Sequence, residues 1–213
     1  MQRLYDGFHI IKPLLPRCKA DRADSRKNVV TLCMDQAEND IKRVVLIGAE
    51  STGKTTLAEA LAAHYETVWA PEYLREFVEQ KGALPEPSDS RLIAEGHLAQ
   101  EATFRPQAHR VLFLDTDLIS TCVYHRYYFG TTLPWLERRA AERSADLYLL
   151  TDIDIPWTPD PGQRDGPAVR AALHAFFLDE LLARSLPHVL VSGSTEARME
   201  TALRAVKALF ETA

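Results

Sequence analysis

The sequence has few cysteines and no long apolar run, and both absences narrow what the protein can be. Its 213 residues include three cysteines, which form no C-x-x-C pair, so we expect a reducing cytoplasm and no disulfide framework or zinc site. No apolar stretch approaches the roughly 18 residues of a membrane span, and the N-terminus lacks the apolar run of a signal peptide. The net charge of −5 argues against a general nucleic-acid binder. We therefore expect neither a membrane nor a nucleic acid as partner, and the composition does not fix the oligomeric state.

What the sequence does contain is a phosphate-binding loop at residues 48–55. The stretch GAESTGKT matches G-x-x-x-x-G-K-[ST], follows the apolar run 44–47 and precedes an alanine- and leucine-rich segment. Two glycines allow the backbone to curl so that successive N–H groups face one centre, which suits anionic oxygens. Lys54 is placed to reach the β- and γ-phosphates, and the Thr55 hydroxyl is a suitable ligand for Mg²⁺. The loop therefore predicts ATP and Mg²⁺ as cofactors. The residues expected to contact ATP here are Gly48, Glu50, Ser51, Thr52, Gly53, Lys54, Thr55 and Thr56.

Strand-like and helix-like segments alternate along the rest of the chain. We expect strands over 42–47, 67–71, 111–115, 146–151 and 188–192. We expect helices over 54–64, 72–81, 90–107, 117–128, 133–143, 167–184 and 195–211. This alternation implies right-handed crossovers and a parallel sheet with helices on both faces. The predicted fold class is an α/β P-loop NTPase fold: a five-stranded parallel sheet flanked by helices, of the nucleoside- or nucleotide-kinase type, with residues 152–166 as a lid loop.

Residues 1–40 differ in composition from the rest. Residues 1–33 hold seven basic and three acidic side chains, so this segment carries a formal charge of +4 and the remainder carries −9. Pro13 and Pro16 interrupt an irregular apolar pattern. We interpret 1–40 as a basic, poorly ordered N-terminal extension of a kinase domain at 41–213. Two alternatives are that Met34 is the natural start, or that a short helix or strand at 28–34 packs on the core.

Carboxylates follow the second and third predicted strands, where ligands of parallel α/β sheets bind. Asp115 and Asp117 follow the third strand. Asp115 is the candidate magnesium ligand and Asp117 a candidate substrate ligand, and either aspartate could serve as a catalytic base or simply as a turn or cap residue. Glu72 follows the second strand, where an acceptor hydroxyl would lie, and is the first candidate for the base. The alternative for Glu72 is a carboxylate that offsets the dipole of the helix that it precedes.

Aromatic and basic side chains near these strand ends are candidates for binding the substrate. Tyr73 and Trp157 could stack on a flat ring, although both types of residue also pack in cores. Arg75 could hold substrate oxygens or pair with Glu72. Tyr128 belongs to an aromatic cluster whose default role is packing, with a place at the substrate cleft as the alternative.

Two loops complete the predicted site. The loop after the fourth strand carries Arg164, and Arg170 follows one helical turn later; such arginines could neutralise the transferring phosphoryl group, or belong to a solvated loop. The loop after the fifth strand contains Ser192 and Gly193, which could flank the adenine of ATP. Capping of the last helix by a Ser or Thr of this loop is the alternative.

Four segments together resemble the ribosylnicotinamide kinase domain of NadR-type proteins, an AAA-type ATPase family. They are Gly48–Thr55, Pro71–Glu76, Asp115–Asp117 with Tyr128–Gly130, and Asp154–Trp157 leading to Asp165, Gly166 and Arg170. The resemblance covers residues 42–210. It implies transfer of the ATP γ-phosphate to the 5′-hydroxyl of nicotinamide riboside, giving nicotinamide mononucleotide in NAD salvage. It also implies that the acidic segment after the second strand, Trp157 and Asp165 face the nucleoside and that the lid arginines contact phosphates.

The sequence departs from the family pattern in two places. The spacer at 158–164 is longer than is common between Pro-Trp and Asp-Gly, which affects the roles of Arg164 and Arg170. No adenylyltransferase signature occurs, so we expect a stand-alone kinase. The alternatives are a kinase for another nucleoside or small alcohol, and a non-catalytic switch that binds ATP and a pyridine nucleotide. The acidic strand ends favour transfer, because a switch needs no base on the acceptor side.

Overall fold

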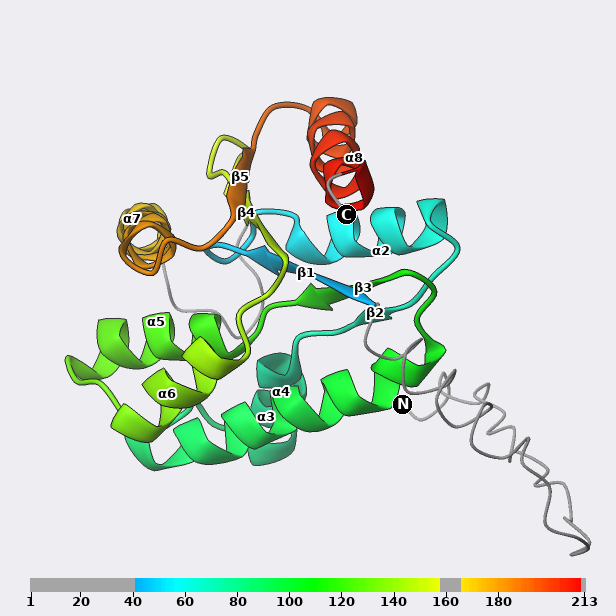
Figure 1. Cartoon of the computed structure of the whole chain (residues 1–213). Helices are drawn as coiled ribbons and strands as arrows, with labels where there is room; N and C mark the ends of the chain where they lie inside the picture. The colour runs from blue at the N-terminus through cyan, green and yellow to red at the C-terminus, as the bar shows by residue number, and fades with distance from the viewer. Residues whose placement is uncertain (1–40, 158–165, 212–213) are drawn as a thin grey trace, which may run out of the picture. The chain divides into compact units, whose positions relative to one another are not determined.

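The protein is seen here in a computed structural model that describes residues 41–157 and 166–211. Its centre is a parallel sheet of five strands in the order β2-β3-β1-β4-β5 (Figure 1). The strands are β1 (Lys42–Ile47), β2 (Trp69–Ala70), β3 (Val111–Asp115), β4 (Leu147–Thr151) and β5 (His188–Val191). The predicted fold class is confirmed. The predicted extension 1–40 and most of the predicted lid loop lie outside the described residues.

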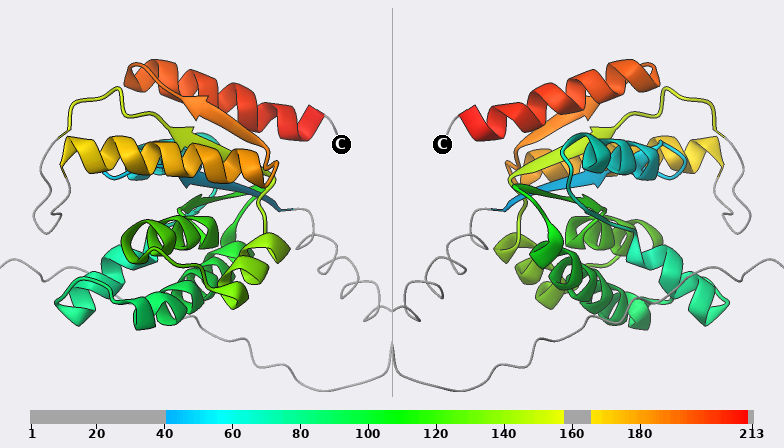
Figure 2. Two further views of the ribbon diagram at one scale, coloured as in Figure 1. Left: turned by 90° about the vertical axis from the view of Figure 1, so that its left-hand side faces the viewer. Right: turned by 90° about the vertical axis from the view of Figure 1, so that its right-hand side faces the viewer.

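Helices cover both faces of this sheet (Figures 1 and 2). One face packs against α2 (Lys54–His64) and α8 (Thr195–Glu211). The other packs against α4 (Ser90–Phe104), α5 (Leu118–Phe129), α6 (Pro134–Glu142) and α7 (Pro167–Ala183), while α3 (Tyr73–Lys81) lies on α4. Strand residues alternate between the two cores: Val44 and Leu46 face α2, and Val45 and Ile47 face α5. Both cores are apolar, which explains the continuous apolar runs of the central strands.

Two predicted elements, the strand 67–71 and the helix 90–107, are each three residues shorter than expected. Strand β2 spans two residues because Thr67 bonds the start of β3 through its side chain: its hydroxyl donates to the Val111 carbonyl and accepts from the His109 N–H, each at 2.8 Å. Helix α4 ends at Phe104 and continues as a 3-10 turn over Arg105–Gln107. Pro106 explains this change, because proline lacks the N–H that an α-helix requires.

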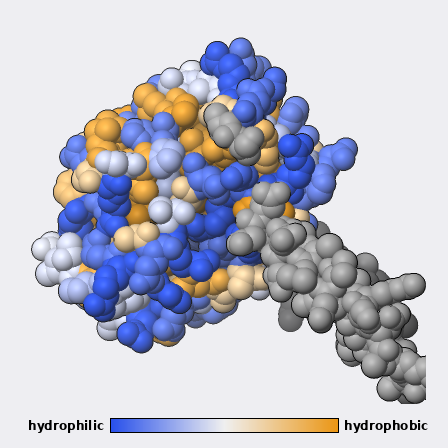
Figure 3. All heavy atoms as spheres, in the orientation of Figure 1, coloured by the Kyte–Doolittle hydropathy of each residue, from blue (hydrophilic) through white to orange (hydrophobic). Residues whose placement is uncertain are grey.

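The described surface is mostly polar with scattered apolar side chains. On the face drawn in Figure 3, hydrophilic residues lie between the hydrophobic ones. The large exposed hydrophobic residues are Leu84, Leu92, Tyr128, Leu182 and Leu190. No helix in the described ranges is both long and apolar enough to cross a membrane. Tyr128 is the member of this set that the sequence predicted to bind substrate.

Helix α3 packs closely on α4 through Tyr73 and Gly96. A Cβ added at Gly96 would lie 1.9 Å from Tyr73 Cε1, so the tyrosine ring occupies the space that any side chain at this position would need. The same ring meets His97 edge-on, with ring centroids 6.1 Å apart. Tyr73 therefore anchors the helix that follows Glu72, and its ring is used in packing.

Replacing Gly96 with alanine is expected to destabilise the protein. The ring of Tyr73 would have to move, and such overpacking typically lowers the free energy of unfolding by about 1–3 kcal/mol, against a helix-propensity gain of about 1 kcal/mol. Thermal and urea unfolding would measure the change. Gly166→Ala is the matched control, because its φ of −93° suits any residue and no atom lies within 4 Å of an added Cβ. An unchanged melting temperature for Gly96→Ala would contradict this account of the α3–α4 contact.

Candidate active site

The phosphate-binding loop joins β1 to α2, and its glycines have the backbone conformations that the sequence predicted. Gly48 has a φ of +142°, and a Cβ there would lie 2.7 Å from Thr151 Oγ1. Gly53 precedes α2 with a φ of +80°. Ser51 also adopts a positive φ, of 52°, which is uncommon for a residue with a side chain. The loop therefore turns tightly against the end of β4 before the helix begins.

The side chains of the loop differ in how deeply they are buried. Lys54 is 8% exposed, and its ammonium donates to the Ala49 carbonyl at 2.9 Å. The Thr52 hydroxyl is buried, bonding the Ala49 carbonyl and the Thr151 hydroxyl at 2.7 Å each, so the Thr52 side chain supports the loop. Glu50 is half-buried and Thr56 is exposed at the start of α2. That these residues contact ATP stays a prediction. Because the Thr52 hydroxyl bonds other protein groups, only the backbone of Thr52 is available to ATP.

Thr55 and Asp115 are brought together although 60 residues separate them. The Thr55 hydroxyl donates to Asp115 Oδ2 at 2.5 Å. Asp115 is 1% exposed, and its other oxygen, Oδ1, is buried without a hydrogen-bond partner among the described residues. Two adjacent hard oxygens, one of them unsatisfied, suit Mg²⁺, which takes oxygen ligands and keeps several waters. Within the described chain no three His, Cys, Asp or Glu side chains form a metal cluster, so an ion here would take its other ligands from ATP and water.

Glu72 precedes α3 but does not cap it. Its side chain makes no capping hydrogen bond and is 14% exposed, with Oε2 lying 3.8 Å from Arg75 Nη2. Burial raises the pKa of Glu72, the Lys54 ammonium opposes that rise, and the Asp115 carboxylate adds to it. Glu72 therefore lies within electrostatic range of Lys54 in the phosphate-binding loop and of Asp115 at the end of β3. The alternative in which Glu72 offsets the helix dipole stays a prediction, because that effect requires no capping hydrogen bond.

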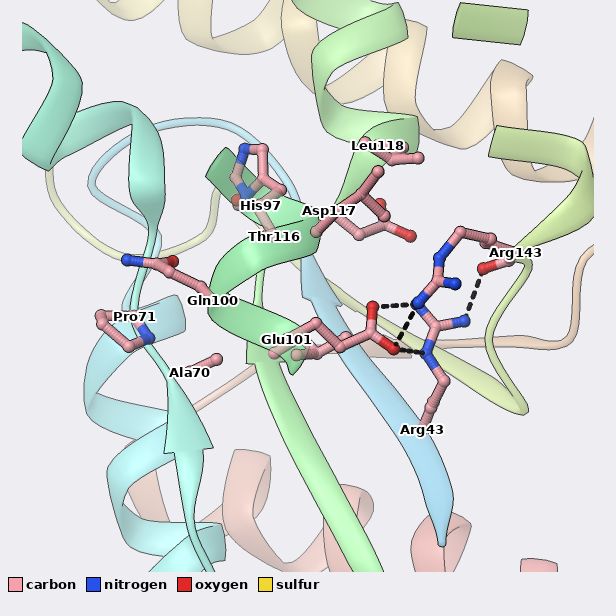
Figure 4. Close-up of a pocket in the computed structure, with 12 residues that line it drawn as sticks. Arg43, Ala70, Pro71, His97, Gln100, Glu101, Thr116, Asp117, Leu118 and Arg143 are labelled. Atoms are coloured by element: carbon pink, nitrogen blue, oxygen red, sulfur yellow. Dashed lines mark hydrogen bonds and ion pairs between the residues drawn. The ribbon is translucent and has the colours of Figure 1, made fainter. Parts of the chain in front are cut away.

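Asp117 has a different environment. One of its oxygens accepts from the Ile119 N–H at 2.9 Å and so caps α5, and the other accepts from the Tyr148 hydroxyl at 3.0 Å. The side chain is buried and lines a small pocket beside Arg43, Glu101 and Arg143 on the α4 side of the sheet (Figure 4). None of the residues lining this pocket belongs to the phosphate-binding loop. The geometry thus gives Asp117 a structural role and does not support it as the base or as a substrate ligand.

Two substitutions at Asp117 distinguish these roles. Asp117→Ala removes the helix cap and the bond to Tyr148, so the free energy of unfolding should fall by about 1–3 kcal/mol. Asp117→Asn keeps an acceptor for the Ile119 N–H and should be close to wild type in stability. We expect neither variant to show the loss of about 10²–10⁴-fold in turnover that removal of a base causes. Such a loss in Asp117→Asn, with normal thermal unfolding, would restore Asp117 as the candidate base.

A pair of tyrosines on α5 borders the acceptor side of the site. The Tyr124 and Tyr128 rings stack with centroids 6.2 Å apart, and Tyr124 meets Phe177 edge-on. Burial raises the pKa of the Tyr124 hydroxyl, and the Glu72 and Glu50 carboxylates raise it further. Tyr128 is 46% exposed. Tyr124 belongs to the aromatic cluster for which the sequence offered packing as the default and the substrate cleft as the alternative, and its place in the site stays a prediction.

The other residues that the sequence predicted to bind substrate differ in how well the structure supports that role. The Tyr73 ring packs on Gly96, as described above, so its predicted stacking on a substrate ring is not supported. Arg75 is exposed and lies beside Glu72, which agrees with the pairing alternative. Trp157 is half-buried at the edge of the described segment. Arg164 and Asp165 lie outside the described residues.

Side chains bond the backbones of the loops after β4 and β5. Arg170, in the first turn of α7, donates to the carbonyls of Ile155 at 3.0 Å and Ser51 at 3.2 Å. Both backbone polar groups of Gly193 have protein partners: its N–H donates to Asp154 Oδ2 at 2.5 Å and its carbonyl accepts from Arg198 at 3.0 Å. Ser192 is exposed, and Ser194 rather than Ser192 accepts from the Ala197 N–H near the start of α8.

Arg198 is a buried site residue that the sequence reading missed. It occupies the core-facing stripe of α8 together with Ala202 and Val206, at spacings of four residues. An arginine in an apolar helical stripe was the available signal, because a charge there must have partners if it is to be buried.

Comparison with known proteins agrees with this architecture. A family model described as an AAA domain matches residues 43–198. The trifunctional NAD biosynthesis/regulator protein NadR of Salmonella typhimurium is 33% identical over 147 residues, which are 67% of this chain and 36% of that protein. The protein of the same name from Escherichia coli is 34% identical over 125 residues, covering 56% and 30%. The chain therefore spans about a third of the length of these relatives. The predicted resemblance is confirmed.

Solved structures confirm the fold. A NadR protein in complex with NR has a TM-score of 0.70 at 24% identity, with 89% of this chain and 60% of that chain covered. A thymidylate kinase from Ehrlichia chaffeensis has a TM-score of 0.56 at 15% identity, with 79% and 98% covered. At these identities the likeness establishes a P-loop kinase fold, and the chemistry has to be argued from the site.

Proposed function

This chain belongs to the AAA domain family, and we propose that it is an ATP-dependent kinase that phosphorylates the 5′-hydroxyl of nicotinamide riboside. The observation that supports the proposal is Glu72: a mostly buried carboxylate without a capping bond, whose pKa is raised by burial, lowered by the Lys54 ammonium and raised by the Asp115 carboxylate. A phosphate-binding loop alone is compatible with any use of ATP. A carboxylate facing that loop from another strand end supports a reaction that removes a proton from an acceptor.

The proposed reaction involves the acceptor hydroxyl, ATP and a small number of protein groups. The acceptor oxygen forms a bond to the γ-phosphorus, the bond from that phosphorus to the β–γ bridging oxygen breaks, and ADP leaves. The hydroxyl proton passes to the Glu72 carboxylate. Lys54 neutralises negative charge on the phosphates, and the loop N–H groups hold them in position. Thr55 and Asp115 would hold Mg²⁺, which when bound supplies positive charge to the β- and γ-phosphate oxygens.

The acceptor side supports a positively charged aromatic substrate. The stacked rings of Tyr124 and Tyr128 offer an aromatic surface, and the Glu72 and Glu50 carboxylates raise the pKa of the Tyr124 hydroxyl. The nicotinamide ring of the riboside carries a positive charge, so aromatic faces and carboxylates suit it better than a neutral base. The names of the similar proteins, which refer to NAD biosynthesis and to NR, agree with this class of substrate. We place the reaction in the cytoplasm, as the cysteine content indicated.

One assay separates this proposal from its alternatives. The protein is incubated with Mg-ATP and a panel of nicotinamide riboside, neutral nucleosides and small alcohols, and mass spectrometry identifies any phosphorylated product. We expect nicotinamide mononucleotide as the main product. A different phosphorylated product would assign another acceptor. Tight binding of ATP and the riboside without any product would favour the switch.

A further inference from the structure

Arg198 connects three segments that are far apart in the sequence. Its guanidinium donates to the carbonyl of Gly193 at 3.0 Å, of Thr52 at 3.0 Å and of Asp152 at 3.1 Å, and it pairs with the Asp154 carboxylate. Thr52 belongs to the phosphate-binding loop, Asp152 and Asp154 follow β4, and Gly193 follows β5. The side chain is 6% exposed, so these contacts are made inside the protein.

Asp154 completes this connection from the other side. One of its oxygens pairs with Arg198, and the other accepts from the Gly193 N–H at 2.5 Å. Both polar backbone groups of Gly193 are thereby fixed. Gly193 also has a φ of +90°, and a Cβ there would lie 3.2 Å from Ala197 Cβ. The turn after β5 thus has one conformation that depends on Arg198 and Asp154.

A second arginine holds the neighbouring peptide of the phosphate-binding loop. Arg170 donates to the Ser51 carbonyl and Arg198 to the Thr52 carbonyl. In a planar peptide the carbonyl and the following N–H point in opposite directions. Fixing the carbonyls of Ser51 and Thr52 therefore fixes the N–H groups of Thr52 and Gly53. Those groups belong to the concavity that binds anionic oxygens in loops of this pattern.

We propose that Arg198 is a positioning residue for the nucleotide, which fixes the phosphate-binding loop and the turn after β5 in one arrangement before ATP binds. The inference rests on the proposed use of ATP, but it concerns binding and does not depend on the acceptor. Arginine is needed because its planar fork serves several acceptors at once, whereas lysine presents one flexible point charge. The competing explanation is that Arg198 only stabilises the packing of α8.

Binding measured separately from turnover tests this inference. The variants are Arg198→Gln and Arg198→Lys, with Arg184→Gln as the matched control. Arg184 is another largely buried arginine, but its partners are Glu180 and Glu137, on α7 and α6. Isothermal titration gives the Kd for Mg-ATP, competition gives the Kd for inorganic tripolyphosphate, and circular dichroism confirms folding at the temperature used.

We expect the Kd for both probes to rise by about tenfold or more in Arg198→Gln, since small displacements of positioned groups have effects of this size. Arg198→Lys should recover only part of this loss. Arg184→Gln should lower the melting temperature and leave both Kd values within about twofold of wild type, because it changes no contact of the loop. Unchanged tripolyphosphate binding in folded Arg198→Gln would overturn the proposal, as would an equal loss of affinity in Arg184→Gln.

If Arg198→Gln does not fold, a second variant still tests the proposal. Asp154→Asn keeps the arginine and weakens the acceptor of the Gly193 N–H, so its Kd for ATP should rise by a smaller factor than in Arg198→Gln or Arg198→Lys. Wild-type affinity in folded Asp154→Asn and Arg198→Lys would overturn the proposal. If wild-type protein binds Mg-ATP but phosphorylates no acceptor, the proposed function fails and these binding measurements still decide the role of Arg198.

Discussion

Lys54→Ala is expected to reduce phosphoryl transfer by about 10²–10³-fold or more, the usual cost of removing one preorganised group that stabilises developing charge. The Lys54 ammonium is 8% exposed and lies within the phosphate-binding loop, so no solvent cation can replace it with the same geometry. Its removal also leaves the pKa of Glu72 higher, because Lys54 is the group that lowers it most. Steady-state kinetics with nicotinamide riboside and Mg-ATP would measure the loss.

Two further variants make the Lys54 result interpretable. Lys54→Arg keeps the charge but changes its shape, so we expect it to recover little activity. Lys42→Ala is the control on the same strand–loop–helix unit: Lys42 pairs with Asp146 at 3.3 Å near the opposite end of β1 and should be dispensable for turnover. Near wild-type turnover by Lys54→Ala would show that phosphate transfer does not take place at this loop.

Glu72→Gln is expected to lower kcat by about 10²–10⁴-fold, the range for loss of a general base. It should do so without destabilising the protein. Burial raises the pKa of Glu72, so the folded state binds this proton more tightly than the unfolded state. The stability contribution is therefore present at low pH and is lost as the pH rises through the raised pKa. The ionised form of Glu72 opposes folding, and the neutral amide removes this penalty.

The pH dependence provides the second measurement for Glu72. In the wild-type protein kcat should rise with pH through a value above the ordinary range of glutamate, because the ionised form accepts the proton. This limb should disappear in Glu72→Gln, whose melting temperature at neutral pH should equal or exceed that of wild type. Glu79→Gln, an exposed position on the same helix, is the control and should alter neither property. A loss of both stability and activity in Glu72→Gln would indicate a structural role instead.

The elements of the fold were largely predictable because each depends on local pattern. Continuous apolar runs indicated β1, β3 and β4, and the loop motif fixed where α2 begins. The misjudged boundaries have local causes as well. Pro106 changes the end of α4, and the Thr67 hydroxyl replaces backbone pairing at the start of β2. In these two cases a single side chain overrode the apolar pattern.

The site was predictable only in part. Glu72, Asp115 and Asp117 were all candidates for the base in the sequence, since each lies at or just after the end of a strand. The structure distinguishes the three carboxylates. Asp115 accepts a hydrogen bond from the Thr55 hydroxyl, whereas Asp117 caps α5 and accepts a hydrogen bond from the Tyr148 hydroxyl. Glu72 makes no capping hydrogen bond, and the Lys54 ammonium of the loop lowers its pKa. The cap of α5 is local, but Thr55 and Tyr148 lie tens of residues away along the chain from Asp115 and Asp117, so spacing within one segment carries no information about them.

The sequence by itself determined the phosphate-binding loop, the parallel sheet and the edge at which ligands bind, because the path of the backbone follows from glycine positions and from apolar periodicity. The tertiary structure alone decided which buried polar groups have protein partners. It directed Tyr73 to Gly96 and Asp117 to Tyr148, and it gave Arg198 the carbonyls of three loops. The physical reason is that a hydrogen bond depends on distances between segments that only packing brings together.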